Sequence, residues 1–307
     1  MSLFAPSYYP AFRCIAGDCH HSCCIGWEID IDPQTLAKYR SMPPKARKQI
    51  LSHTVTQKGT TSFRLAENDR CPFLTQEGLC QLILTHGEEI LCDICREHPR
   101  FYNHFSNRTE VGLGLCCEEA ARLILTDPQP FSLICLEDMA ANNLADPFEA
   151  DFFATREAIF TTLTNRDLPL QERIDATLQN FSIDRKLIYE SDPYWLTVYR
   201  NLERLDPAWD TALDAWKQDH PTAMEWNETA VEQLIMYFLY RHLSDAMDDG
   251  LYAPRIAFAL LSAHMICCIA GANGGELATL IDIARAYSAE VEYNEDAVAL
   301  LMEQLNS

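Results

Sequence analysis

Glycine is scarce in this chain, and long apolar runs are missing. Only 11 of the 307 residues are glycine, and no strand-like segment leads through a glycine-rich turn into a helix, as the nucleotide sites of doubly wound α/β proteins require. No stretch approaches the roughly 20 uninterrupted apolar residues of a membrane span, and the N-terminus lacks a charged segment followed by an apolar one. We therefore expect a cytoplasmic protein with no membrane partner.

Positive charge is also in short supply, and the excess of negative charge lies in the second part of the chain. Residues 1–125 hold 13 Lys and Arg against 14 Asp and Glu, whereas residues 126–307 hold 11 against 31. Such an acidic surface repels nucleic acid and can attract a cationic partner, although a solvated face that maintains solubility explains the charge as well. We predict no nucleic-acid binding.

Cysteine, in contrast, is abundant and unevenly placed. Of the 13 cysteines, all but Cys267 and Cys268 lie within the first 135 residues. Because cytosolic reductants keep thiols reduced, this number of cysteines indicates metal binding or catalysis rather than disulfides. The changes in cysteine content and in charge predict a cysteine-rich, metal-binding domain over residues 1–125 and an acidic helical domain over residues 126–307.

The second region has the pattern of helices separated by proline and short polar segments. Three of the expected helices start at an Asp-Pro pair, where the missing N–H of proline costs nothing: Asp146-Pro147, Asp192-Pro193 and Asp206-Pro207. The expected helices span residues 147–164, 169–180, 193–205, 207–218, 223–247 and 254–272. Within them we expect His242 at the edge of the core, and Cys267 and Cys268 as buried structural thiols.

The predicted fold class is mainly α, with an irregular, metal-stapled N-terminal region followed by an all-helical C-terminal region. In the irregular part, short helices are expected over residues 33–40 and 44–51, a hairpin over 54–64 and a further helix from Glu118. So irregular a region is usually held by something other than apolar packing, which fits a metal-stapled fold.

The cysteines of the first region have the spacing of metal ligands. In the first set, short segments let the chain loop back so that successive sulfurs face one centre; this set is Cys14, Cys19, Cys23 and Cys24. Adjacent cysteines do not easily face one metal, so Cys23 and Cys24 serve different centres or one of them only packs. The second set is Cys71, Cys80, Cys92, Cys95, Cys116 and Cys117. Near it, Arg96 and Arg100 either offset thiolate charge or form ordinary surface ion pairs.

These motifs in combination resemble the flagellin lysine N-methylase family. The motifs are Phe12-x-Cys14, Cys19-x-x-x-Cys23-Cys24-x-Gly26-Trp27, Cys71-Pro-Phe-Leu74, Gly78-x-Cys80, Gly87-Glu88, Cys95-Arg-x-x-Pro-Arg100 and Cys117-x-Glu-Ala-Ala-Arg122. The resemblance is close over residues 12–125 and looser beyond. It implies eight metal ligands, Cys14, Cys19, Cys23, Cys24, Cys71, Cys80, Cys95 and Cys117, and treats Cys92 and Cys116 as additions. Glu118 departs from the family, which commonly has proline there.

The resemblance implies an enzyme that transfers a methyl group from S-adenosylmethionine to lysines of flagellin or another lysine-bearing protein. It also implies a metal centre. Four thiolates suit zinc and an iron–sulfur cluster equally, and the resemblance favours 4Fe–4S. The histidines near the cysteines in the sequence either lie at the surface or support the ligands, or one of them replaces a thiolate; they are His20, His21, His86 and His98.

The residues leave the mechanism open. Cluster-bound S-adenosylmethionine usually goes with three cysteines separated by three and then two residues. Cys19 and Cys23 give the first gap, but Cys24 follows at once, so radical and polar methyl transfer both remain possible. No catalytic or S-adenosylmethionine-binding residue is identified. The alternative function is a non-catalytic zinc- or iron-binding module that docks a protein partner.

Overall fold

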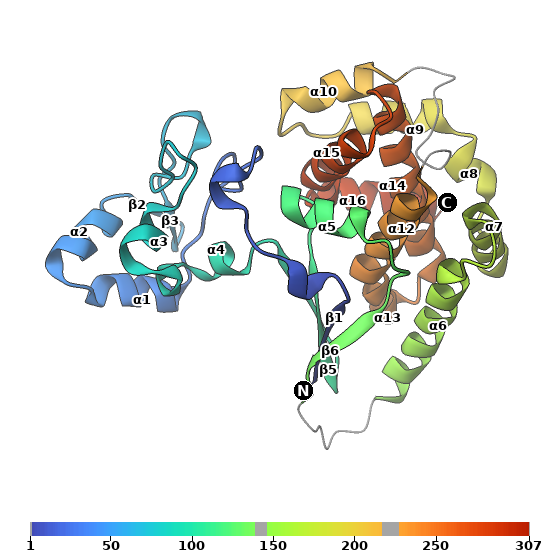
Figure 1. Ribbon diagram of the computed structural model, residues 1–307, viewed down its shortest axis with the longest axis horizontal. Helices are drawn as coiled ribbons and strands as arrows, with labels where there is room; N and C mark the ends of the chain where they lie inside the picture. The colour runs from blue at the N-terminus through green and yellow to red at the C-terminus, as the bar shows by residue number, and fades with distance from the viewer. Residues whose placement is uncertain (1, 139–145, 217–226, 307) are drawn as a thin grey trace. The chain divides into compact units, whose positions relative to one another are not determined.

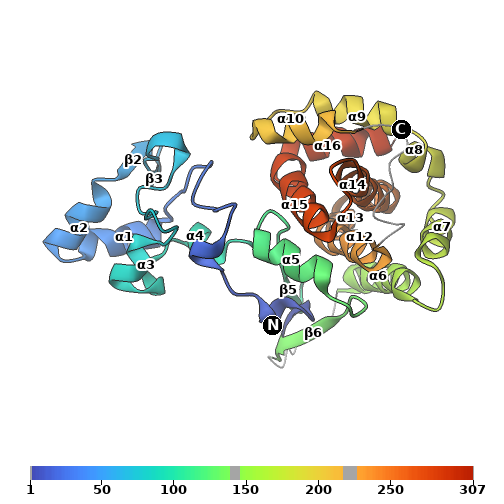
Figure 2. The ribbon, with the colours of Figure 1, turned by 45° about the horizontal axis from the view of Figure 1, so that its top comes forward.

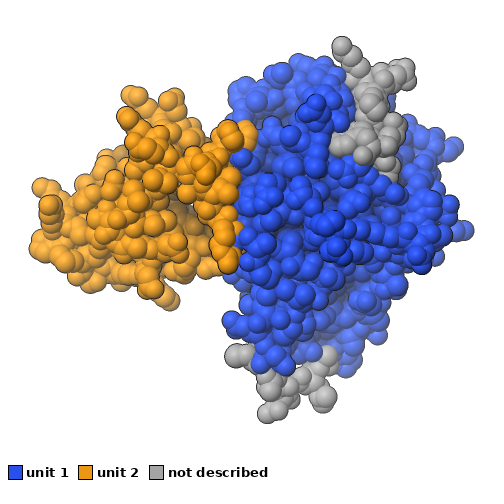
Figure 3. Space-filling model, in the orientation of Figure 1, with its two compact units in different colours: residues 1–12, 101–307 blue, residues 13–100 orange. Residues whose placement is uncertain are grey.

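The computed structural model describes residues 2–138, 146–216 and 227–306, and the chain divides into two compact units (Figures 1 and 3). Arg13–Arg100 form the small unit, and Met1–Phe12 together with Phe101–Ser307 form the large unit. The chain therefore starts in the large unit, builds the small unit and returns. These limits differ from the division at residue 125, because residues 101–125 supply buried side chains such as Leu113 to the core of the large unit.

Helices make up most of the large unit. They are α5 (Glu118–Thr126), α6 (Pro147–Thr164), α7 (Leu170–Asn180), α8 (Arg185–Tyr189), α9 (Asp192–Arg200), α10 (Pro207–Asp214), α12 (Glu228–His242), α13 (Ala246–Asp249), α14 (Tyr252–Ala272), α15 (Leu277–Tyr287) and α16 (Glu295–Leu305). Helix α14 lies among the others in Figure 2 and packs against α12, α15, α16 and α8. A helix that is apolar on all sides is expected at such a buried, central position.

The predicted helices are present, with altered ends. Helix α6 has the predicted bounds, α7 begins one residue late, α9 stops at Arg200 and α12 stops at His242. The predicted end at residue 218 and the predicted start at residue 223 lie outside the described residues. Helix α14 is also long and apolar enough to cross a membrane, but 78% of its most apolar window is buried inside the protein, as in the core helix of a globular unit.

A four-stranded sheet adds to the predicted helical fold, and only one of its strands lies within residues 126–307, where we expected helices alone. Its strands are β1 (Ser2–Pro6), β4 (Arg100–His104), β5 (Arg108–Leu113) and β6 (Leu133–Glu137), in the order β4-β5-β1-β6. Strand β1 pairs with β5 in parallel and with β6 in the antiparallel direction. Strands β4 and β5 are close in the sequence, but β1 pairs with β5 and β6 across the whole sequence of the small unit, so local patterns do not indicate these two pairings.

A buried ion pair joins this sheet to α6. The guanidinium of Arg156 donates to both carboxylate oxygens of Glu110 on β5, at 2.7 and 2.8 Å, and both side chains are almost fully buried. Asp146 starts α6 by accepting a hydrogen bond from the Phe148 N–H at 2.8 Å, with Pro147 in the first turn. The Asp-Pro pair therefore acts as the sequence predicts.

The small unit is built from short elements. These are α1 (Pro33–Ser41), α2 (Pro44–Leu51), β2 (Thr54–Gln57), β3 (Thr60–Phe63), α3 (Gln81–His86) and α4 (Asp93–Glu97). The predicted hairpin is confirmed: Lys58 and Gly59 link β2 to β3, and both have positive φ, 49° and 91°, as a tight two-residue hairpin turn requires.

The small unit also has an apolar core of its own, which the irregular pattern did not predict. Its buried side chains are Ile29, Ile31, Tyr39, Ile50, Phe63, Cys71, Phe73, Leu82, Ile90 and Cys92. The Tyr39 hydroxyl donates to the Ile90 carbonyl at 2.8 Å inside it. Two cysteines thus belong to the core itself, and apolar packing contributes to holding this region together.

Candidate metal centre

Backbone pairing brings distant cysteines of the small unit together. The Cys71 N–H donates to the Cys24 carbonyl at 2.8 Å, which joins the first cysteine set to the second. Leu74 and Cys80 form an isolated antiparallel bridge, so the loop after Cys71 folds back onto the start of α3. The segment with Cys24 and the distant loop from Cys71 to Cys80 therefore present cysteines to one region.

Two further cysteines come from the beginning of α4. Cys92 lies at its N-cap position and Cys95 in its first turn, where the Cys95 N–H donates to the Cys92 carbonyl at 3.1 Å and helps to lower the pKa of Cys92. Cys80 has the same position before α3, and the N–H groups of Ile83 and Leu82 act against the burial that raises its pKa. Such N–H donors stabilise the thiolate form of a cysteine.

These five cysteines, called here the thiol group, interact electrostatically; they are Cys24, Cys71, Cys80, Cys92 and Cys95. Burial and, to a smaller extent, the nearby thiols raise the pKa of Cys71 to about 11. Burial likewise raises the pKa of Cys80. Because each negative sulfur disfavours the next, the group cannot ionise fully without a compensating cation.

Two members of the thiol group have their pKa values lowered by a neighbouring thiol. A hydrogen bond from Cys23 lowers the pKa of Cys24 to about 7, with smaller help from Ser22 and the charge of Arg70. The Cys92 and Cys95 side chains share a hydrogen bond, which lowers the pKa of Cys92 and raises that of Cys95. Cys24 and Cys92 are therefore the members of the group that lose a proton most readily.

The thiol group contains four of the eight predicted ligands, Cys24, Cys71, Cys80 and Cys95. Cys14 and Cys23 are exposed, and Cys19 is partly exposed. Cys117 lies in the large unit, at the N-cap position of α5. Sequence matching missed Cys92, which is buried within the group. The Cys92-x-x-Cys95 spacing was the signal that could have identified it.

The charged and imidazole side chains near the group have mixed roles. Arg96 forms ion pairs with Asp93 and Glu97 and is half exposed, so the surface-pair interpretation holds for it. Arg70 is instead the cation that lowers the pKa of Cys24. Burial lowers the pKa of His98 to about 4, and its Nε2 atom has no hydrogen-bond partner, so a neutral imidazole nitrogen is present in this unit.

The donor set fits a soft, cysteine-ligated centre. It supplies more than four sulfurs, N–H groups directed at them and one nearby guanidinium. A tetrahedral zinc ion holds its sulfurs about 3.8 Å apart, given a Zn–S length of about 2.3 Å. Among the described residues, which include all five cysteines, no three of these sulfurs lie within 4.8 Å of one another. The group is therefore more open than a closed zinc site.

A buried polar network lies beside Cys116 and Cys117 in the large unit. The Glu292 carboxylate, which ends a π-helical turn over Ser288–Glu292, accepts from the Tyr237 hydroxyl at 2.9 Å and contacts His242 at 2.8 Å and Arg241 at 3.1 Å. Burial raises its pKa, but the charge of Arg241 and the bond to His242 outweigh that effect and lower it. His242 thus lies at the core edge as predicted, bound to Glu292.

Comparison with known proteins confirms the family resemblance. Over 134 residues, 42% of this chain, it is 30% identical to a protein of Salmonella choleraesuis and 29% identical to one of Salmonella typhimurium, both named Lysine-N-methylase. It is 27% identical over the same length to the Flagellar biosynthetic protein FliU of Salmonella muenchen. No protein-family profile and no solved structure matches the chain.

The extent of these matches is limited. The matched segment spans 33% of each lysine-N-methylase and 79% of the FliU protein. The chain thus covers about a third of the length of the two enzymes, and their names describe proteins that are larger than the segment shared with it.

Proposed function

We propose that the chain is a protein-lysine N-methyltransferase that acts on flagellin and uses S-adenosylmethionine. The observation that carries this proposal is the similarity to proteins named Lysine-N-methylase over 134 residues, and the FliU similarity supports the flagellar substrate. The cytoplasm is the proposed location, because its reductants keep a thiol group of this kind reduced.

Four members of the thiol group hold a 4Fe–4S cluster in this proposal. The cysteine motifs that resemble the lysine N-methylase family favour a cluster over a single zinc ion, and cysteine thiolates are the usual ligands of such a cluster. The iron ions of such a cluster would offset the mutual repulsion of the thiolates, and Arg70 adds positive charge near Cys24. When bound, the cluster supplies a redox centre that this chain's own side chains do not provide.

The charge distribution supports a cationic protein substrate. Residues 126–307 hold 31 Asp and Glu against 11 Lys and Arg, and an acidic surface raises the local concentration of lysine-rich segments. The same surface disfavours nucleic acid as a partner. Charges at the edge of a binding surface act mainly on the rate of association.

The test is methyl transfer to purified flagellin. Anaerobically prepared protein, S-adenosylmethionine and unmethylated flagellin are incubated, and lysine methylation is measured by mass spectrometry. We expect added mass on flagellin lysines that requires S-adenosylmethionine and is lost in the Cys71→Ser/Cys80→Ser double variant. Absence of methylation with iron-replete, folded protein would refute the enzymatic proposal.

A metal-binding module without catalysis is the second candidate. The observation in its favour is that the small unit is compact and has its own apolar core, so a metal there can serve stability alone. In that case metal removal lowers the melting temperature, and flagellin binds without being methylated. The methylation assay separates the two candidates directly.

A further inference from the structure

Three side chains that can bind a metal lie close together in the large unit. None of them is among the ligands predicted from the sequence. Asp192 opens α9, and His264 and Cys268 lie one turn apart on α14. The His264 Nε2 atom is 2.8 Å from Asp192 Oδ1 and 3.6 Å from the Cys268 sulfur, which is 3.9 Å from Asp192 Oδ2. All three ligand atoms lie within 4.8 Å of one another.

Asp192 departs from the role that its sequence context predicts. At the other Asp-Pro helix starts the aspartate side chain caps its own helix, as Asp146 and Asp206 do for Phe148 and Ala208. Helix α9 instead begins at Asp192 itself and has no side-chain cap. Its carboxylate is thereby available to face α14.

The Cys268 sulfur contacts both nitrogens of the His264 ring, at 3.6 Å from Nε2 and 3.8 Å from Nδ1. Nε2 is the nitrogen that is nearest to the sulfur and also to the carboxylate, 2.8 Å from Asp192 Oδ1. A nitrogen that faces a sulfur and a carboxylate together suits the shared ligation of one cation.

The distances and charges fit a small divalent cation. With Zn–S near 2.3 Å and Zn–N and Zn–O near 2.0–2.2 Å, tetrahedral geometry separates the ligand atoms by about 3.3–3.6 Å. The sulfur distances of 3.6 and 3.9 Å are close to this, and the His264–Asp192 bond need open by only about half an ångström. A thiolate and a carboxylate together balance two positive charges.

We propose that Asp192, His264 and Cys268 bind one zinc ion, with the fourth position taken by water. Sulfur, nitrogen and oxygen donors in one tetrahedral set suit this borderline-soft ion. Cys268 is buried, whereas the Asp192 side chain is 31% exposed, so the ion can enter from the Asp192 side. His264 also borders a small pocket whose wall includes Tyr189.

The experiment measures zinc bound by the full-length protein. Zinc per chain is determined by mass spectrometry after dialysis against limiting zinc, for wild type and for Asp192→Asn, His264→Gln and Cys268→Ser. Cys267→Ser is the matched control, because Cys267 is an adjacent buried thiol outside the three-residue set. We expect each of the three ligand variants to lose one equivalent of zinc and the control to lose none.

Two results would overturn the proposal. One is equal zinc content in wild type, the control and Asp192→Asn, a change at a partly exposed residue that should leave folding intact. The other is a melting transition of the large unit, followed by the fluorescence of buried Trp195, that zinc raises equally in wild type and in Asp192→Asn. Zinc bound by the small unit contributes alike to all variants and cancels in these comparisons.

Discussion

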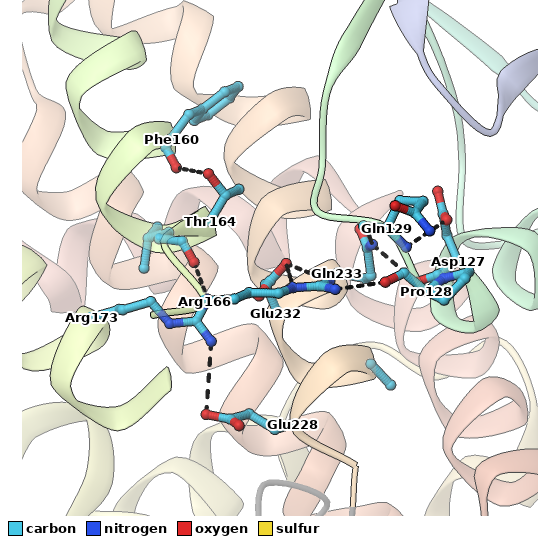
Figure 4. Close-up of polar contacts among 12 residues, drawn as sticks. Asp127, Pro128, Gln129, Phe160, Thr164, Arg166, Arg173, Glu228, Glu232 and Gln233 are labelled. Atoms are coloured by element: carbon cyan, nitrogen blue, oxygen red, sulfur yellow. Dashed lines mark hydrogen bonds and ion pairs between the residues drawn. The ribbon is translucent and has the colours of Figure 1, made fainter. Parts of the chain in front are cut away.

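Replacing Glu232 by glutamine should destabilise the large unit by about 3–5 kcal/mol, the usual cost of removing one partner from a buried ion pair. Glu232 on α12 is 1% exposed and receives hydrogen bonds from Arg173 of α7 at 2.6 Å and from Arg166 at 2.9 Å (Figure 4). Arg173 is itself only 3% exposed. Without the carboxylate, the remaining counter-charge of Arg173 is Glu228, which is 3.7 Å away and half exposed.

Urea unfolding followed by tryptophan fluorescence measures this loss, because Trp195 and Trp209 are both buried in the large unit. At a slope of about 3 kcal/mol per molar urea, the midpoint should fall by roughly 1–2 M. The control is Asp175→Asn on α7, since the Asp175–Arg185 pair is about half exposed and should be worth about 0–1 kcal/mol. Equal midpoints for the two variants would refute the assignment of Glu232 as the buried counter-charge.

Three further predictions concern the metal and acid stability. Anaerobically purified protein should be brown and contain iron, and stoichiometric zinc without iron in the small unit after reconstitution would contradict the proposed cluster. Cys92→Ser should lose most of this iron while Cys135→Ser, at an exposed thiol, keeps it; equal iron in both would exclude Cys92 as a ligand. Because the pKa of Glu292 is lowered in the folded protein, its contribution to stability is present above about pH 4.3 and lost as the pH falls further. The urea midpoint of wild type should therefore drop more steeply in that range than that of Glu292→Gln, and parallel pH curves would contradict this.

The helices were predictable because their signals are local. Asp-Pro starts and apolar periodicity located α6 and α10, and a lysine-glycine pair located the turn between β2 and β3. The sheet was not predictable in this way, since Ala5 on β1 pairs with Ile134 on β6. No pattern within either short strand identifies a partner so far along the chain.

The candidate sites show the same distinction between local and distant information. Spacing alone marked the region of the thiol group, and four of its members were among the matched cysteines. Cys92 was set aside because matching weighs positions that relatives share, whereas burial beside Cys95 depends on the fold. Cys268 was expected to be structural; its contact with Asp192 joins two helices and is visible only in three dimensions.

The path of the chain through its two units has a consequence for synthesis. Strand β1 leaves the ribosome before its neighbours β5 and β6, which follow only after the whole small unit. At 5–20 residues per second, β1 waits on the order of ten seconds for Ile134, its partner on β6. The small unit is complete once Arg100 has emerged, so the proposed metal centre would be able to form on the nascent chain while the large unit is still unfinished.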